Sequence, residues 1–158
     1  MANPITIIPT ILKYASKLWG YPLRFYYTKE RLDPLLILDI SASGDRVNYQ
    51  YCTQEAYCWL QAYNLSPFDF TIDRIKVEVQ LNYGGCFTCE NNLPITIDGA
   101  SKKQFFVKSK SPMTSESFER VKKSETACVN LEAQIITSIR PFAINRSISD
   151  VKNFRLLG

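Results

Sequence analysis

From about residue 35 onward the chain alternates apolar and polar positions, which is the period of a β-strand that buries one face. The clearest run covers residues 127–137, where Val129, Leu131 and Ala133 alternate with polar residues. The other runs that we predict as strands cover residues 35–40, 47–51, 56–64, 93–97, 104–108 and 142–144. Turn-forming residues separate the runs about every eight to twelve positions, which favours an antiparallel sandwich.

A change of parity interrupts the apolar pattern of residues 68–81. Phe70 and Ile72 hold even positions, whereas Ile75 and Val77 hold odd positions. An extra residue between these pairs would keep both halves facing one core, because a bulge resets the alternation. The sequence therefore predicts a β-bulge in this segment.

Residues 111–123 have helical rather than strand periodicity. Pro112 suits the first helical position, and Glu116 and Arg120 form a favourable i,i+4 ion pair on a helix. We predict one short inserted helix in this segment.

A second helix is predicted near the N-terminus, beginning after Pro9 and ending before Gly20, with one apolar face. At 1.5 Å per residue its roughly ten residues reach about 15 Å, half the ~30 Å thickness of the hydrocarbon core, so it cannot span a bilayer. The apolar face either packs on its own domain or lies on a membrane surface or a partner. In the second case the contact residues are Ile11, Tyr14, Leu18 and Trp19.

Together these elements predict an all-β protein, an antiparallel immunoglobulin-like β-sandwich of about seven or eight strands with an N-terminal amphipathic helix and one short inserted helix. Residues 1–33 form the N-terminal helix and a connector, and residues 34–158 form the sandwich with a short C-terminal tail. Tyr57, Trp59 and Tyr63 share one face of a predicted strand. We expect the N-terminal helix or another chain to cover this face.

The composition is that of one globular domain, with 158 residues, 46% apolar and 22% charged. The chain has no histidine, which excludes the Ser-His-Asp and Cys-His nucleophile systems and most catalytic zinc sites. None of its six glycines lies in a phosphate-cradling loop pattern. We therefore predict that the protein is not an enzyme and uses no cofactor.

Five cysteines are an odd number, so they cannot form a fully paired disulfide framework within one chain. This favours a reducing, cytoplasmic compartment, as does the lack of positive charge ahead of the first apolar run. Cys86 and Cys89 have the spacing of half a zinc ribbon or of a redox motif, without a second pair at similar spacing. Three interpretations of this pair stay open: an incidental hairpin feature, a disulfide, or a metal site.

The net charge of +4 is unevenly distributed, with +3 in residues 1–33, −5 in residues 34–100 and +6 in residues 101–158. The basic cluster of the last third is a candidate anion-binding site. It consists of Lys102, Lys103, Lys108, Lys110, Lys122 and Lys123. The cluster is interpreted either as a solvated surface, as a contact with an anionic membrane or partner, or as a nucleic-acid contact.

Residues 62–72 read Ala-Tyr-Asn-Leu-Ser-Pro-Phe-Asp-Phe-Thr-Ile, and the long amphipathic segment 74–81 follows. This order resembles the asparagine, turn, proline-phenylalanine and apolar-strand signature of late-embryogenesis-abundant domains of the second, water-stress type. Leu65 stands where that family usually has a proline. The resemblance implies a non-enzymatic sandwich, and many members carry a hydrophobic segment ahead of it that tethers them to a membrane.

We therefore expect a non-enzymatic binding or structural module that docks on a membrane surface or on a protein partner through its N-terminal helix. The alternatives are a nucleic-acid-binding protein that uses the basic last third, or a subunit of a larger assembly, including a homo-oligomer. The expected location is cytoplasmic, with a peripheral position on a membrane in the tethered case.

Overall fold

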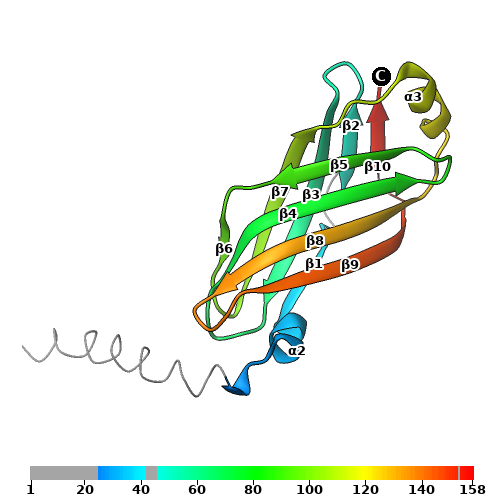
Figure 1. Cartoon of the computed structure of the whole chain (residues 1–158). Coiled ribbons are helices and arrows are strands. Elements are labelled where there is room, and N and C mark those ends of the chain that lie inside the picture. Colours follow the sequence, from blue (N-terminus) through cyan, green and yellow to red (C-terminus); the bar gives the residue numbers. More distant parts are fainter. Residues whose placement is uncertain (1–24, 42–45, 153) are drawn as a thin grey trace, which may run out of the picture.

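Two five-stranded sheets lie face to face in the computed structural model, which describes residues 25–41, 46–152 and 154–158 (Figure 1). We call them sheet A and sheet B. Sheet A contains β1 (Leu36–Ile40), β2 (Val47–Gln50), β3 (Glu55–Asn64), β7 (Ser101–Lys110) and β10 (Phe154–Leu157). Sheet B contains β4 (Phe70–Leu81), β5 (Cys86–Asn91), β6 (Ile95–Ile97), β8 (Ala127–Thr137) and β9 (Phe142–Val151).

Strand β3 is the centre of sheet A. One of its edges pairs with β7 along all ten residues, and its other edge is shared by β1 and β2. Strand β10 extends the sheet by pairing in parallel with β2. The inward positions of sheet A are apolar, and the polar side chains that alternate with them lie on its outer face. The longest part of this outer face is formed by β3 and β7.

Strand β4 has the corresponding place in sheet B, with β8 on one edge and β5 and β6 on the other. Strand β9 pairs only with β8 in the described part of the chain and is an edge strand. The register of β4 against β8 shifts between Ile72 and Arg74, which confirms the predicted bulge.

The core is formed by the inward-facing side chains of both sheets, among them Tyr49, Phe70 and Phe87. Full burial of one such side chain contributes about 1.5–3 kcal/mol, so this alternation supplies most of the drive for folding. The Tyr49 hydroxyl oxygen lies 2.8 Å from Gln54 Oε1 and 2.9 Å from the carbonyl oxygen of Ser111, and its single proton is donated to one of these acceptors. The hydroxyl of this fully buried side chain is thereby satisfied.

Serine side chains join the two sheets where β5 and β7 run side by side. Ser109 Oγ donates to the carbonyl of Thr88 at 2.7 Å, and the Thr88 amide donates to Ser111 Oγ at 3.1 Å. These bonds satisfy backbone groups on edges that would otherwise be open to pairing with another chain.

Short helices close the two ends of the sandwich. The α2 helix (Lys29–Leu32) and the η1 turn of 3-10 helix (Asp33–Leu35) lead into β1 at the end that is lowest in Figure 1. The α3 helix (Ser115–Val121) lies at the opposite end, where the Phe118 ring stacks on Tyr51 at 4.6 Å. We call these ends the α2 end and the α3 end.

The all-β sandwich and the short inserted helix are confirmed, and the ion pair between Glu116 and Arg120 is present at 3.6 Å. The predicted start of that helix is wrong, because Thr114 caps it and Pro112 precedes it instead of taking its first position. The immunoglobulin-like topology stays a prediction.

The expected seven or eight strands are too few, since the described residues form ten. Residues 86–91, which none of the predicted strands covers, form β5, because the long β4 offers them an edge to pair with. The predicted short C-terminal tail includes a further strand, since Phe154–Leu157 forms β10 on the edge of β2. The predicted N-terminal amphipathic helix lies outside the described residues.

Within the described segments there is no helix that is long and apolar enough to cross a membrane.

Candidate functional site

Large apolar side chains are exposed together at the α2 end. Phe25 is 84% exposed and Leu65 is 58% exposed, and Tyr26 and Ile136 are exposed as well. These residues lie at one end of the sandwich because of where their strands begin and end. Leu65 follows directly after β3, Ile136 is the penultimate residue of β8, and β1 begins at the same end. Exposed apolar groups gathered in one region point to a contact surface more than scattered ones do.

The chain before β1 is held firmly to the sandwich. The Tyr27 ring packs edge-on against Phe68 with centroids 5.3 Å apart, and Leu32 is fully buried. Leu65 donates its amide to the carbonyl of Leu35 at 2.8 Å. The backbone that carries the exposed side chains of Phe25 and Tyr26 is therefore anchored to the sandwich by the residues that follow it.

Basic side chains border this apolar surface. The Arg31 guanidinium lies over the Tyr26 ring, 4.5 Å from its centroid, and Arg31 Nη1 donates to the Tyr26 carbonyl at 3.0 Å. Lys29 is exposed on the same helix. An aromatic surface flanked by cations is the arrangement that suits the headgroup layer of a membrane.

A second surface lies on the outer face of sheet A, where four cross-strand pairs of β3 and β7 follow one another. We call these eight residues the aromatic ladder. They are Tyr57 opposite Lys108, Trp59 opposite Phe106, Gln61 opposite Gln104, and Tyr63 opposite Lys102.

The side chains of the ladder contact one another across the strands. The Trp59 and Phe106 rings are 5.2 Å apart, and each side chain is close to half exposed. Lys102 Nζ lies 5.2 Å from the centroid of the Tyr63 ring. The Gln104 amide donates to Gln61 Oε1 at 3.1 Å, so the ladder is ordered along its length.

Glu55 organises the end of the ladder that is nearest α3. Its carboxylate accepts a hydrogen bond from the Tyr57 hydroxyl at 2.6 Å and pairs with Lys108 Nζ at 2.9 Å. The bond from Tyr57, followed by the bond from Lys108, lowers the pKa of Glu55 below its ordinary value. The same contact with Glu55 raises the pKa of Lys108, so both groups are ionised at neutral pH.

The six lysines of the predicted anion-binding cluster do not gather in one place. Lys102 and Lys103 begin β7 at the α2 end, whereas Lys110 ends it opposite Glu55. Lys103 alternates with the outward positions of β7 and is not on the outer face, and its Nζ donates to the Thr96 carbonyl at 2.7 Å. Two further lysines, Lys122 and Lys123, follow α3, and only Lys102 and Lys108 belong to the ladder.

The residues predicted to contact a membrane or partner, Ile11, Tyr14, Leu18 and Trp19, lie outside the described residues.

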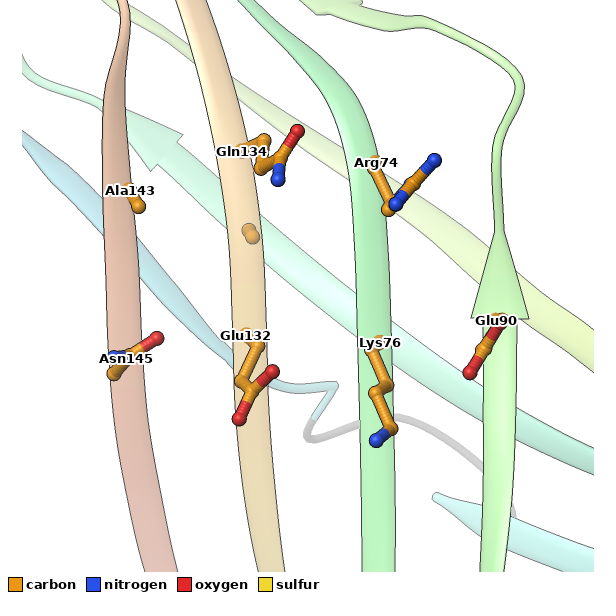
Figure 2. A pocket seen from close by; sticks show the side chains of 8 residues that line it. Arg74, Lys76, Glu90, Glu132, Gln134, Ala143 and Asn145 are labelled. Carbon is orange, nitrogen blue, oxygen red and sulfur yellow. The ribbon is translucent and has the colours of Figure 1, made fainter.

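The outer face of sheet B has a shallow polar pocket of about 260 Å³ (Figure 2). Lys76 on β4 stands between Glu132 on β8 and Glu90 on β5, which are its cross-strand neighbours. The hollow exists because the neighbouring outward position on β9 is the small Ala143. Alternating charges on a solvated sheet face stabilise cross-strand pairing, and we assign the pocket no ligand.

Cys86 and Cys89 lie on opposite faces of β5, with Cys86 exposed and Cys89 buried. In this arrangement they cannot bind one metal ion or bond to each other. Burial raises the pKa of Cys89 to about 12, and burial also raises the pKa of Cys58. Both cysteines are therefore inert thiols of the core, and the described residues contain no cluster suited to a metal.

Phe106 and Gln104 were not singled out from the sequence. Phe105 and Phe106 are adjacent, so the pattern alone does not tell which of them faces outward. The alternation around these residues could have identified Phe106 as the outward one. Gln104 and Lys108 are polar and Val107 is apolar, so the even positions, including residue 106, lie on the polar face.

Neither a family model nor a curated protein matches this chain. Solved structures with a similar arrangement include the Northeast Structural Genomics Consortium target SoR45, with 9% identity, a TM-score of 0.49, and coverage of 77% of this chain and 89% of that chain. Another is a candidate late-embryogenesis-abundant protein, with 10% identity, a TM-score of 0.46, and coverage of 95% and 92%. A third is described as ApaA from Bordetella pertussis, with 6% identity, a TM-score of 0.47, and coverage of 73% and 92%.

The similar structures thus include a candidate late-embryogenesis-abundant protein at very low sequence identity. Membership of that family stays a prediction.

Proposed function

We propose that the protein is a non-enzymatic binding module that docks on an anionic membrane surface with its α2 end. The observation that carries this proposal is the exposure of Phe25, Tyr26 and Leu65 beside Lys29 and Arg31. Aromatic and aliphatic groups partition into the headgroup boundary, and the adjacent cations are attracted to anionic lipids.

The sequence ahead of this surface agrees with the proposal. The stripe of Ile11, Leu18 and Trp19 belongs to the segment that precedes Phe25, so both apolar regions would contact the same surface. The proposal includes a cytoplasmic location and the finer classification as an immunoglobulin-like domain of the late-embryogenesis-abundant type. That classification depends on the resemblance of residues 62–81.

Flotation with vesicles of phosphatidylcholine and phosphatidylserine tests the proposal. The full chain is expected to float, and the double variant Phe25→Asp/Leu65→Asp should lose at least about tenfold in vesicle affinity, because two apolar contacts are removed. The variant Leu18→Asp/Trp19→Asp tests the N-terminal contribution in the same way. Tyr83→Asp is the matched control, since Tyr83 is 59% exposed in the turn between β4 and β5, far from the α2 end.

Vesicle binding that all variants retain, or a full chain that does not float, would overturn the membrane proposal. If the full chain does not float, a protein partner would be the remaining candidate ligand of the α2 end.

A further inference from the structure

The aromatic ladder leaves its two central rings open to solvent. Trp59 is 42% exposed and Phe106 is 51% exposed, although both belong to the middle of a continuous pair of strands. Single exposed aromatic residues are common on protein surfaces, but here they are paired and lie in one row with two tyrosines. The row forms a platform of aromatic rings on the sheet, in which the planes of Trp59 and Phe106 are inclined at 49° to each other.

The dimensions of the platform suit an extended chain of planar groups. Residues on one face of a strand are about 6.8 Å apart, so the row from Tyr57 to Tyr63 is about 20 Å long. Nucleic-acid bases stack on aromatic side chains with little regard to sequence, and a single strand can splay its bases onto such a platform.

The two lysines of the ladder favour an anionic ligand, although Asp39 on β1, the other cross-strand neighbour of Gln61, is exposed on the same face. Lys102 and Lys108 stand at the two ends of the ladder, and the paired amides of Gln61 and Gln104 lie between them. Glu55 offsets part of the charge of Lys108, so ring stacking rather than phosphate attraction has to supply most of the affinity.

We infer that the aromatic ladder binds a single-stranded polynucleotide, with bases stacked on Trp59 and Phe106 and with phosphates contacting Lys102 and Lys108. Only the Tyr63–Lys102 pair of the ladder reaches the α2 end, so base stacking on Trp59 and Phe106 does not depend on membrane docking.

Fluorescence anisotropy of a labelled oligothymidylate of about twelve nucleotides, a length within the range that single-strand-binding folds cover, tests the inference with the full chain at low salt. Saturable binding is expected. The double variant Trp59→Ala/Phe106→Ala should weaken it at least about fivefold, the loss expected when even one base loses its stacking partner. Tyr83→Ala, which removes an exposed aromatic ring away from the ladder, should leave the affinity unchanged.

Lysine variants provide a second test that does not touch the rings. Each lost phosphate contact reduces the slope of log affinity against log salt by about 0.7 for a single strand, so Lys102→Gln/Lys108→Gln should reduce it by about 1.4. In a Trp19→Phe background, saturating oligothymidylate should also quench the fluorescence of Trp59, the remaining tryptophan.

Three results would overturn the inference. They are no binding of the oligothymidylate at low salt, equal affinity for the same sequence as a duplex, and equal affinity of the ring variant and the unaltered chain. Tighter binding of polyglutamate than of the oligothymidylate would show that the face recognises an acidic polypeptide, and would overturn it as well.

Discussion

Arg146 on β9 reaches Asp33 in η1, and its Nη2 atom lies 3.2 Å from both Asp33 Oδ1 and the Asp33 carbonyl oxygen. The two residues are 113 positions apart in the sequence, so this contact joins the edge of sheet B to the segment before β1. It helps to fix the position of α2, and with it the exposed side chains that precede the helix.

Replacing Arg146 with alanine should loosen the α2 end without unfolding the protein. Both side chains of the pair are more than a third exposed, so the free energy of unfolding should fall by only about 0.5 kcal/mol. Amide hydrogen exchange in residues 28–35 should nevertheless become faster. Arg120→Ala is the control, because its pair with Glu116 lies within α3. Unchanged exchange in residues 28–35 would show that the contact has no such role.

Asn64 is a buried hydrogen-bonding centre of the α2 end. Its amide group lies 2.8–3.1 Å from the carbonyls of Phe68, Ile97 and Asp98, and its Oδ1 accepts from the amide and the hydroxyl of Ser66. The substitution Asn64→Ala leaves several of these groups without partners. The free energy of unfolding should fall by about 3 kcal/mol, measured by chemical denaturation.

The matched control for this substitution is Asn91→Ala. Within the described part of the chain the Asn91 side chain bonds only to Leu93, at an exposed position, and its loss should cost less than about 1 kcal/mol. If the two variants were equally stable, the network around Asn64 would not be a structural centre.

Thiol labelling should separate the cysteines by their faces. Cys52 and Cys86 are exposed and should react with a maleimide in the native protein, whereas Cys58 and Cys89 should react only after unfolding. Partial desolvation, with the negative charge of Glu78, raises the pKa of Cys86, so it should react more slowly than a free model thiol at neutral pH. A faster reaction at Cys86 would contradict the environment that the structure gives this thiol.

The carboxylate of Glu55 should titrate below 4.5, the ordinary glutamate value, when followed by carbon NMR. Because its pKa is lower in the folded state, Glu55 stabilises the fold above about pH 4.5, and this contribution is lost as the pH falls through the folded pKa. Tyr57→Phe removes the strongest hydrogen bond to Glu55 and should raise its pKa toward 4.5. An unchanged value in this variant would mean that Lys108 alone sets it.

Much of the fold was predictable because burial on one side leaves a period of two along each strand. The parity change between Ile72 and Ile75 located the bulge from sequence alone. Strand β10 was missed because Phe154–Leu157 is short, and its partner β2 lies about a hundred residues earlier in the chain. Residues 154–157 become a strand because they pair with β2, which forms an edge of sheet A only after the sheet has folded.

The candidate surfaces were less predictable, because they depend on which strands become neighbours. The sequence placed Tyr57, Trp59 and Tyr63 on one face, but the pairing of β3 with β7 adds Phe106 opposite Trp59. The same pairing separates lysines that are close in sequence, since Lys102 and Lys110 lie at opposite ends of one extended strand.

Hydrogen exchange of the full chain with and without phosphatidylserine-containing vesicles tests the central claim most directly. The account predicts that vesicles slow exchange at the α2 end, in residues 25–35 and 64–68, and leave the turn at residues 82–85 unchanged. Slower exchange at residues 82–85 with no change at the α2 end, or no change anywhere, would contradict it.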